Sequence, residues 1–231
     1  MPYKTALFLI ISSHIAGVIG IGLPVHPDFV RLTPFSLLLS TSLVLYFHTQ
    51  KTRRFWYFLT ISWLIGFWIE VLGVNTGVIF GVYRYDYVFG WKVFNTPLLI
   101  GVNWLVTAYC CGITAYYLLP RSGVWLQAAL GAALMTGLDV LVEPVAMHSG
   151  FWSWEGDTVP MQNYVAWFIT GFVLQYLFFA WKIGERNRLA LILLICQALF
   201  FIILSCAHTL TSLTSHIFHS LTSLTLSSSN L

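Results

Sequence analysis

The chain has 231 residues, of which 58% are hydrophobic and only 8% are charged, and its net charge is +3. Soluble domains carry about 25% charged residues. This composition therefore excludes an ordinary soluble domain and places the chain among integral membrane proteins. The excess of positive charge is small and divided between loops, so it does not indicate nucleic-acid binding.

Apolar stretches long enough to cross a bilayer recur along the chain. A transmembrane helix needs about 20 predominantly apolar residues. Seven stretches qualify: residues 5–22, 32–48, 55–73, 97–119, 124–143, 161–181 and 189–207. The sequence therefore predicts an all-α, polytopic bundle of about seven transmembrane helices, forming one domain over residues 1–208. Residues 209–231 form a Ser/Thr/Leu-rich tail, for which low complexity predicts an extra amphipathic turn or disorder.

The basic residues are divided unequally between the two ends of this bundle. Arg31, Arg84 and Lys92 lie on the side of the loops after the first, third and fifth spans. The other side holds the N-terminus and the remaining loops, with Lys4, Lys51, Arg53, Arg54, Arg121, Lys182, Arg186 and Arg188. Positive charge favours the cytoplasmic side. We therefore predict a protein of the cell membrane with its N-terminus in the cytoplasm and its C-terminus outside.

Unusual polar and aromatic residues collect on the less basic, outer side. They come from segments far apart in the chain, namely Glu70, Asn75, Tyr83, Asn103, Asp139, Glu143, Trp152, Trp154, Asn163 and Trp167. An ionisable residue inside a span is costly and suggests function. In the alternative interpretation, Glu70 and Glu143 reach the interface or pair with Arg84 and Lys92, and the aromatic residues belong to an interfacial belt.

Asp139 and Glu143 are spaced i, i+4, so they share one face of a helix. Pro144 follows, and we expect the helix to end beside it, with both carboxyl groups at the negative end of its dipole. That position, mutual repulsion and a low dielectric constant all disfavour two negative charges. At least one group is then expected to hold a proton at neutral pH, and two unequal carboxyl groups make an acid and a base. Glu70, also near a helix end, completes a cluster of three.

The available side chains limit the chemistry. The sequence has no Gly-rich phosphate loop and no HExxH or HxxxH metal motif, so we expect no metal site. Protonated carboxyl groups, amides and aromatic rings suit acid-catalysed addition to a lipid-soluble alkene. A carboxylic acid would protonate the double bond, and each aromatic face would stabilise the carbocation by about 0.5–2 kcal/mol. A second carboxylate or an amide would position and deprotonate the water that captures it.

Three segments carry a family resemblance: GFWIEVLGVNTGVIFGVYRYDYVFG, FNTPLLIGVNW and DVLVEPVAMHSGFWSWEGDTVPMQNYVAWF. In order and spacing they resemble the carotenoid biosynthesis membrane family. That family includes carotenoid 1′,2′-hydratases of the bisanhydrobacterioruberin hydratase and γ-carotene hydratase type. The similarity covers residues 63 to about 185.

The resemblance implies a hydration that needs no cofactor. Water would add across the terminal double bond of an acyclic ψ end group, as in lycopene or γ-carotene, and leave a tertiary alcohol. The positions that match the family motifs are Glu70, Asn75, Asn103, Asp139, Glu143 and Asn163. We assign the general acid to Asp139 or Glu143 and water activation to Glu70. The residues expected to line the cation pocket are Tyr83, Trp152, Trp154 and Trp167.

The sequence leaves two other classes of function open, a different enzyme and a protein without enzymatic activity. A membrane lycopene cyclase also protonates a polyene end group, but its cation cyclises or loses a proton instead of capturing water. A proton-coupled transporter, or a carotenoid-binding membrane subunit, also places carboxylates in the membrane. The expected partners are a lipid-soluble carotenoid, membrane lipid and other carotenoid biosynthesis enzymes, and no nucleic acid.

Overall fold

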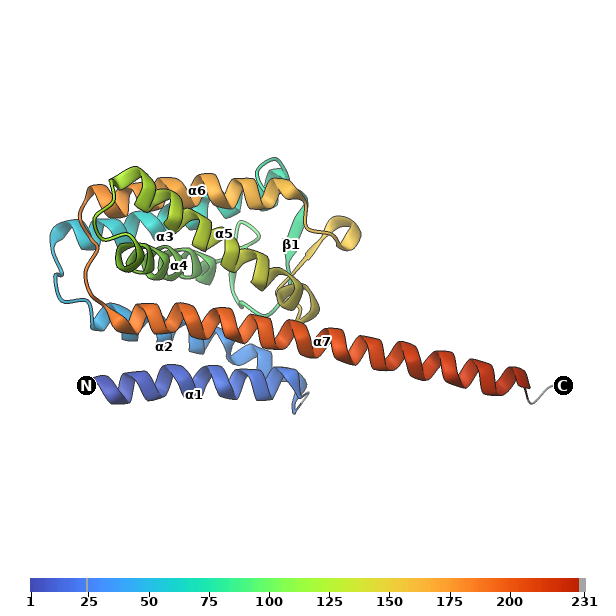
Figure 1. Cartoon of the computed structure of the whole chain (residues 1–231). Helices are drawn as coiled ribbons and strands as arrows, with labels where there is room; N and C mark the ends of the chain where they lie inside the picture. Colours follow the sequence, from blue (N-terminus) through green and yellow to red (C-terminus); the bar gives the residue numbers. More distant parts are fainter. Residues whose placement is uncertain (24, 229–231) are drawn as a thin grey trace.

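The computed structural model describes residues 1–23 and 25–228. Within these residues, seven helices are long and apolar enough to span a membrane, which confirms the predicted all-α bundle (Figure 1). The long helices are α1 (Tyr3–Gly22), α2 (Thr33–Tyr46), α3 (Arg53–Thr76), α4 (Leu98–Leu118), α5 (Val124–His148), α6 (Met161–Ala180) and α7 (Arg188–Ser228). The second span, Asp28–Tyr46, reaches membrane length only because a 3-10 helix leads directly into α2, and the seventh span covers Arg188–Thr211 of α7. Two short 3-10 helices accompany them, η1 (Pro27–Leu32) before α2 and η2 (Glu155–Asp157) before α6.

The predicted end of the fifth span beside Pro144 is wrong, because α5 continues through this proline to His148. Proline removes one backbone N–H, so only the carbonyl of Val140 loses its donor within the helix. The helix α5 packs against α4, α6 and α7, and this packing supports it despite the missing hydrogen bond. Glu143 therefore lies more than one turn before the helix end and Asp139 more than two. A helix dipole acts mainly within the last turn, so burial, and not the dipole, determines the environment of these groups.

The seventh helix is longer than its predicted span. Its backbone continues from Arg188 to Ser228, through most of the stretch in which we expected a turn or disorder. Residues 229–231 of that tail lie outside the described residues.

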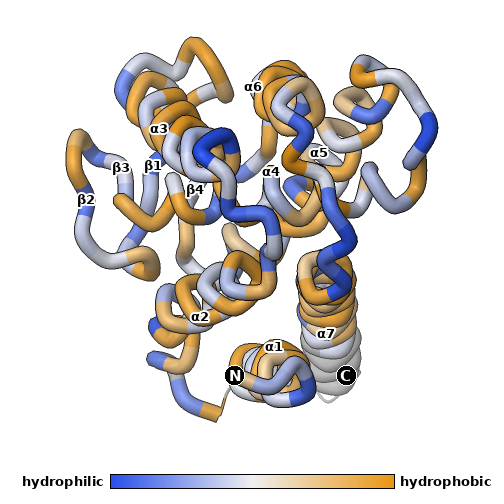
Figure 2. The backbone as a smooth tube through the Cα atoms, turned by 90° about the vertical axis from the view of Figure 1, so that its left-hand side faces the viewer, coloured by the Kyte–Doolittle hydropathy of each residue, from blue (hydrophilic) through white to orange (hydrophobic). Residues whose placement is uncertain are grey.

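The helices form two groups. In the end-on view of Figure 2, α3, α4, α5 and α6 lie together above α1, α2 and α7. Within α4, every residue from Trp104 to Ala115 is buried. Gly66 of α3 faces α4, and a Cβ at this position would lie 2.2 Å from the Cβ of Trp104. A small residue is needed here, because it allows two transmembrane helices to approach closely.

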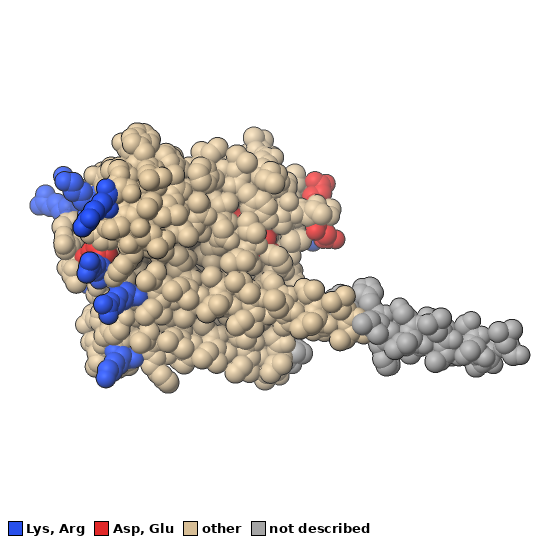
Figure 3. Space-filling model, in the orientation of Figure 1, with Lys and Arg blue, Asp and Glu red and all other residues tan. Residues whose placement is uncertain are grey.

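The two ends of the bundle differ in charge. Lys and Arg gather at the end that holds the N-terminus, and exposed Asp and Glu lie at the opposite end (Figures 1 and 3). The basic end carries the α2–α3, α4–α5 and α6–α7 loops, as predicted from the chain order.

A buried polar network joins two loops at the basic end. Glu185 accepts hydrogen bonds from the backbone N–H groups of Thr49 (2.7 Å) and Gln50 (3.0 Å). Tyr109 Oη of α4 lies 2.9 Å from His48 Nδ1 and accepts a bond of 2.8 Å from Asn187 Nδ2. Burial lowers the pKa of His48 more strongly than the neighbouring carboxylate raises it. The network fastens the α2–α3 and α6–α7 loops to the centre of the bundle.

Short strands, which the sequence pattern does not predict, close the opposite end. Strand β1 (Tyr83–Tyr85) pairs antiparallel with β4 (Trp152–Trp154), and β2 (Lys92–Val93) pairs with β3 (Thr96–Pro97). Tyr83 lies opposite Trp154 and Tyr85 opposite Trp152. Side chains alternate along a strand, so these four aromatic residues share the inner face and are buried. Arg84, between the two tyrosines, is exposed.

Candidate functional site

A cavity of about 400 Å³ lies in the half of the bundle next to β1 and β4. All seven long helices contribute to its wall, which is mostly apolar and aromatic. Its volume is in the range of typical small-molecule sites, about 300–1,000 Å³. The wall also includes Phe35 and Leu32 near the start of α2, and Phe35 is 68% exposed. The cavity therefore reaches the outer surface of the bundle, where lipid would surround the helices.

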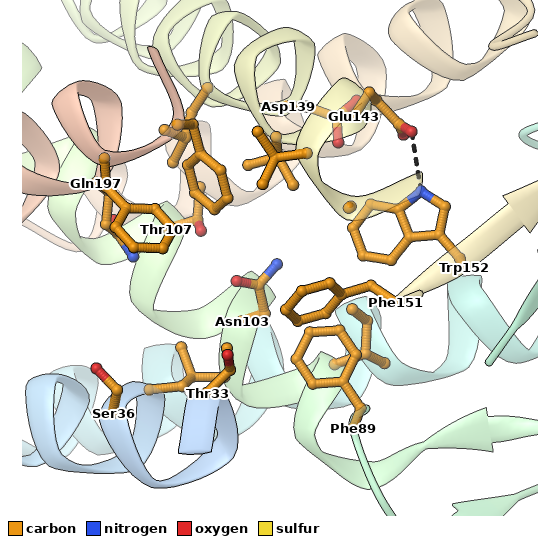
Figure 4. A pocket seen from close by; sticks show the side chains of 18 of the residues that line it. Thr33, Ser36, Phe89, Asn103, Thr107, Asp139, Glu143, Phe151, Trp152 and Gln197 are labelled. Carbon is orange, nitrogen blue, oxygen red and sulfur yellow. Dashed lines mark hydrogen bonds between the residues drawn. The ribbon is translucent and has the colours of Figure 1, made fainter. Parts of the chain in front are cut away.

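The structure brings the sequence-predicted site residues together at this cavity, with one exception. The residues that line it are Glu70, Tyr83, Asn103, Asp139, Glu143, Trp152, Trp154, Asn163 and Trp167. Figure 4 shows Asp139, Glu143, Trp152 and Asn103 around the same space. They come from α3, α4, α5, α6 and the paired strands, so the fold, and not chain proximity, assembles the site.

Asn75 is the exception, since it lies in the last turn of α3 and does not line the cavity. Its Nδ2 donates hydrogen bonds to the backbone carbonyl groups of Val71 (2.7 Å) and Phe94 (2.9 Å). Its Oδ1 accepts a bond of 2.9 Å from Asn95. Phe94 and Asn95 form the turn that joins β2 to β3, and both have positive φ angles. The hydrogen bonds from Asn75 therefore hold this turn in place.

Glu70 accepts hydrogen bonds from three aromatic residues and is only 4% exposed. Its Oε2 accepts from the hydroxyl groups of Tyr83 and Tyr85, the latter at 2.7 Å. Its Oε1 accepts from Trp104 Nε1 at 2.9 Å. An ionised carboxylate can only accept hydrogen bonds, and this surrounding set consists of donors. The arrangement fits a carboxylate at Glu70.

The two tyrosines act as donors in this arrangement. Both lie in β1, outside the membrane-spanning helices. Burial, followed by the charge of Glu70, raises the pKa of Tyr83 and of Tyr85 well above the usual value. Both phenols therefore keep their protons at neutral pH and can donate to Glu70.

Asp139 and Glu143 of α5 form a second carboxyl group pair, and they are 4% and 3% exposed. Glu143 Oε2 accepts hydrogen bonds from the indole N–H groups of Trp152 (2.8 Å) and Trp154 (2.9 Å). Asn163 Nδ2 of α6 lies 2.7 Å from Asp139 Oδ2 and 3.5 Å from Glu143 Oε1. One amide therefore bridges the two carboxyl groups, and Asp139 has the fewest donors of the three acids.

The predicted alternative, in which basic side chains neutralise these acids, is not observed. Arg84 Nε lies 3.8 Å from Asp86 instead, and Lys92 Nζ donates to the backbone carbonyl of Tyr85 at 2.5 Å. Among the described residues, the ion pairs are Asp28–Arg31 and Arg84–Asp86, and His48 Nδ1 lies 3.3 Å from Glu185 Oε1 in the network at the basic end. Three buried carboxyl groups thus share the wall of an apolar cavity without a cation. An arrangement of this kind is costly, and such groups tend to mark functional sites.

Aromatic rings cover much of the remaining wall. Trp167 of α6 lines the cavity and stacks on Trp104 with 3.9 Å between ring centroids. Phe89 and Trp152 line it in near-parallel planes, with centroids 6.4 Å apart. Faces of such rings attract cations. The site therefore combines acids with surfaces that favour a transient positive charge.

Several residues of the site were missed by the sequence interpretation. Tyr85 and Trp104 complete the Glu70 cluster, and Thr107 and Gln197 line the cavity. Thr107 lies one helical turn after Asn103, so the i, i+4 spacing could have identified it. Gln197 is a lone amide in a strongly apolar span, which is also a recognisable signal. Trp104 is the last residue of the segment FNTPLLIGVNW, and the family resemblance of that segment is the signal that could have identified it.

These features define a class, namely a seven-helix integral membrane protein with buried carboxyl groups at an apolar cavity. A family model described as a carotenoid biosynthesis protein matches residues 32–226. This match covers most of the chain, so the chain belongs to the carotenoid biosynthesis protein family.

The chain is also similar to a curated protein, the bisanhydrobacterioruberin hydratase of Haloarcula japonica. The two are 30% identical over 183 residues, which is 71% of this chain and 60% of that relative. The chain thus spans less than two thirds of the length of the relative that it matches. No solved structure shows significant similarity to the chain.

Proposed function

We propose that the protein is a carotenoid hydratase, which adds water across the terminal 1′,2′ double bond of an acyclic ψ end group. Family membership supports a carotenoid substrate, and the similarity to a bisanhydrobacterioruberin hydratase supports hydration. The observation that carries the proposal is the set of three buried carboxyl groups, Glu70, Asp139 and Glu143, on one apolar cavity.

The shape of the site fits one end of a long polyene. A cavity of about 400 Å³ accommodates an end group but not a whole carotenoid. The rest of the polyene would leave the cavity past Leu32 and Phe35 near the start of α2, where the wall is exposed. The substrate would therefore place its terminal double bond among the carboxyl groups while most of its length stays in lipid.

Asp139 is the proposed general acid. It receives one hydrogen bond, from Asn163, whereas Glu70 and Glu143 each accept from three donors. Fewer donors stabilise the charged form less, so the proton of the Asp139–Glu143 pair resides on Asp139. The π electrons of the alkene form a bond from C2′ to that proton, and the positive charge appears at C1′ as a tertiary carbocation.

Glu143 is the proposed base for the attacking water. Two indole donors hold its Oε2, whereas its Oε1 has only the 3.5 Å contact with Asn163. The water oxygen forms a bond with C1′ and releases one proton to this oxygen. The carboxyl pair then again holds one proton, so no oxidant, reductant or cofactor enters the balance.

Glu70, to which the sequence interpretation assigned water activation, takes a different role in the proposal. Three of its roughly four acceptor positions are occupied by Tyr83, Tyr85 and Trp104. It holds the two tyrosine rings in place along the cavity wall and supplies a fixed negative charge near the cation. We keep Trp152, Trp154 and Trp167 as the aromatic wall of the cation pocket.

The first test is the mass of the product. Purified protein in detergent or vesicles is incubated with lycopene or γ-carotene. The carotenoids are separated by chromatography, and their molecular masses are measured by mass spectrometry. We expect a product heavier than the substrate by one water. A product of unchanged mass would indicate a cyclase. Proton-driven uptake into vesicles without any chemical change would indicate a transporter.

The membrane placement is also a proposal. The basic end of the bundle would face the cytoplasm, in agreement with the positive-inside rule. The carboxyl cluster would then lie within the outer half of the cell membrane, and the C-terminus would lie outside. Other carotenoid biosynthesis enzymes are the proposed source of the substrate.

A further inference from the structure

A second group of polar side chains lines the same cavity away from the carboxyl cluster. Its members are Ser40 of α2, Asn103 and Thr107 of α4, and Gln197 of α7. In the view of Figure 4, Gln197 and Thr107 are on the side of the cavity opposite Trp152, and Asn103 is drawn between. Ser40 and Thr107 are only 3% and 2% exposed. We name these four residues the amide–hydroxyl row.

The row lacks hydrogen-bond partners within the described residues. Ser40 Oγ and Gln197 Oε1 are buried atoms with no partner. Thr41, Thr114 and Thr136 donate their hydroxyl groups to the backbone carbonyl four residues earlier, at 2.7, 2.8 and 3.0 Å. Thr107 makes no such bond and lines the cavity instead.

Leaving such groups unpaired is unfavourable, by about 1–3 kcal/mol for each buried donor or acceptor. Buried cavities with several polar groups usually hold water, which makes two to four hydrogen bonds there. A hydration reaction also needs water inside an otherwise apolar cavity. Asn103 and Thr107 lie one turn apart on the same face of α4, so a water bound to them would lie along the cavity wall.

We propose that the amide–hydroxyl row is a water site that supplies and positions the nucleophile for the carbocation. This inference rests on the proposed hydratase function. The row acts after protonation: its water oxygen attacks C1′, and the released proton passes to Glu143. The four side chains are positioning residues, because they act on the water and not on the alkene.

The site determines the fate of the carbocation. A cation that meets positioned water becomes the tertiary alcohol. A carbocation that meets no positioned water loses a proton from C2′ or a neighbouring carbon and becomes an alkene again. In D2O, that return leaves deuterium in the recovered substrate. Loss of the row therefore changes the ratio of deuterated alkene to alcohol, whereas loss of the acid suppresses both products.

The test compares Thr107→Val and Ser40→Ala with the wild-type protein in D2O, using lycopene and mass spectrometry of alkene and alcohol. We expect the ratio of deuterated alkene to alcohol to rise by about tenfold for Thr107→Val, the effect of one hydrogen bond of roughly 1.4 kcal/mol. Thr107→Ser keeps the hydroxyl group and is expected to restore the wild-type ratio.

Matched controls lie outside the cavity. Thr170→Val and Ser62→Ala change buried residues that do not line it, and we expect the wild-type ratio from both. An unchanged ratio in Thr107→Val and Ser40→Ala, with alkene exchange and alcohol formation lowered equally, would overturn the water site. Absence of both deuterated alkene and alcohol in the wild-type protein would overturn the hydratase function itself, and the inference with it.

Discussion

Replacement of Asp139 by Asn is expected to lower alcohol formation by about 10²–10⁴-fold, the usual contribution of a general acid. The amide has nearly the shape of the carboxyl group, and its oxygen can still accept the 2.7 Å hydrogen bond from Asn163. It cannot release a proton to an alkene. The protein should therefore insert and accumulate normally while its chemical step fails. Chromatography of carotenoids from a lycopene-producing host, with the protein level measured in parallel, gives both quantities.

Glu143→Gln tests the other member of the pair and is expected to give a similarly large loss. Its side-chain oxygen can still accept from Trp152 and Trp154, so the strand–helix contact is retained. Asp157→Asn is the matched control, because Asp157 is exposed in η2 and does not line the cavity. Wild-type alcohol yields from both Asp139→Asn and Glu143→Gln would end the assignment of the acid to this pair.

The second large effect concerns stability. Glu70→Leu removes the acceptor for Tyr83, Tyr85 and Trp104, and leaves three buried donors unpaired. Each unpaired donor costs about 1–3 kcal/mol, which together is comparable with the whole stability of a typical domain. We expect the variant to accumulate poorly and to unfold at a much lower temperature in detergent, as measured by fluorescence-detected size-exclusion chromatography.

A compensating variant distinguishes the hydrogen bonds from simple packing. Replacing both partners of a buried hydrogen bond by apolar groups of similar shape is much less costly than removing one. The triple variant with Glu70→Leu, Tyr83→Phe and Tyr85→Phe should therefore recover a large part of the lost thermal stability. Equal stability of Glu70→Leu and the wild-type protein would contradict the role given to the cluster.

Much of the bundle was predictable because the bilayer constrains it strongly. Apolar run lengths predicted α1 to α6 to within a few residues at most ends. Because successive spans cross the bilayer in opposite directions, the sequence placed Glu70, Asn103, Asp139 and Asn163 at the same end of the bundle. The structure brings all four to one cavity. The four residues of this set come from four different helices, so topology alone carried that prediction.

Other parts depended on tertiary contacts that no local pattern reports. The continuation of α5 beyond Pro144 depends on the helices packed around it. The pairing of β1 with β4 joins residues far apart in the chain and aims both tyrosines and both tryptophans inward. Asn75 looked like a site residue, yet its amide completes a turn. An asparagine can either line a functional site or complete a turn, and only its hydrogen-bond partners in the structure distinguish these two roles.

The most direct test of the central claim is the origin of the atoms that are added to the substrate. Purified protein is incubated with lycopene under nitrogen, with a metal chelator, in water labelled with oxygen-18 and deuterium. We predict full activity, an alcohol oxygen that comes from water, and one deuterium on the carbon next to the carbinol carbon. An unlabelled hydroxyl group, or loss of the product when oxygen is removed, would contradict protonation by a buried carboxylic acid followed by water capture.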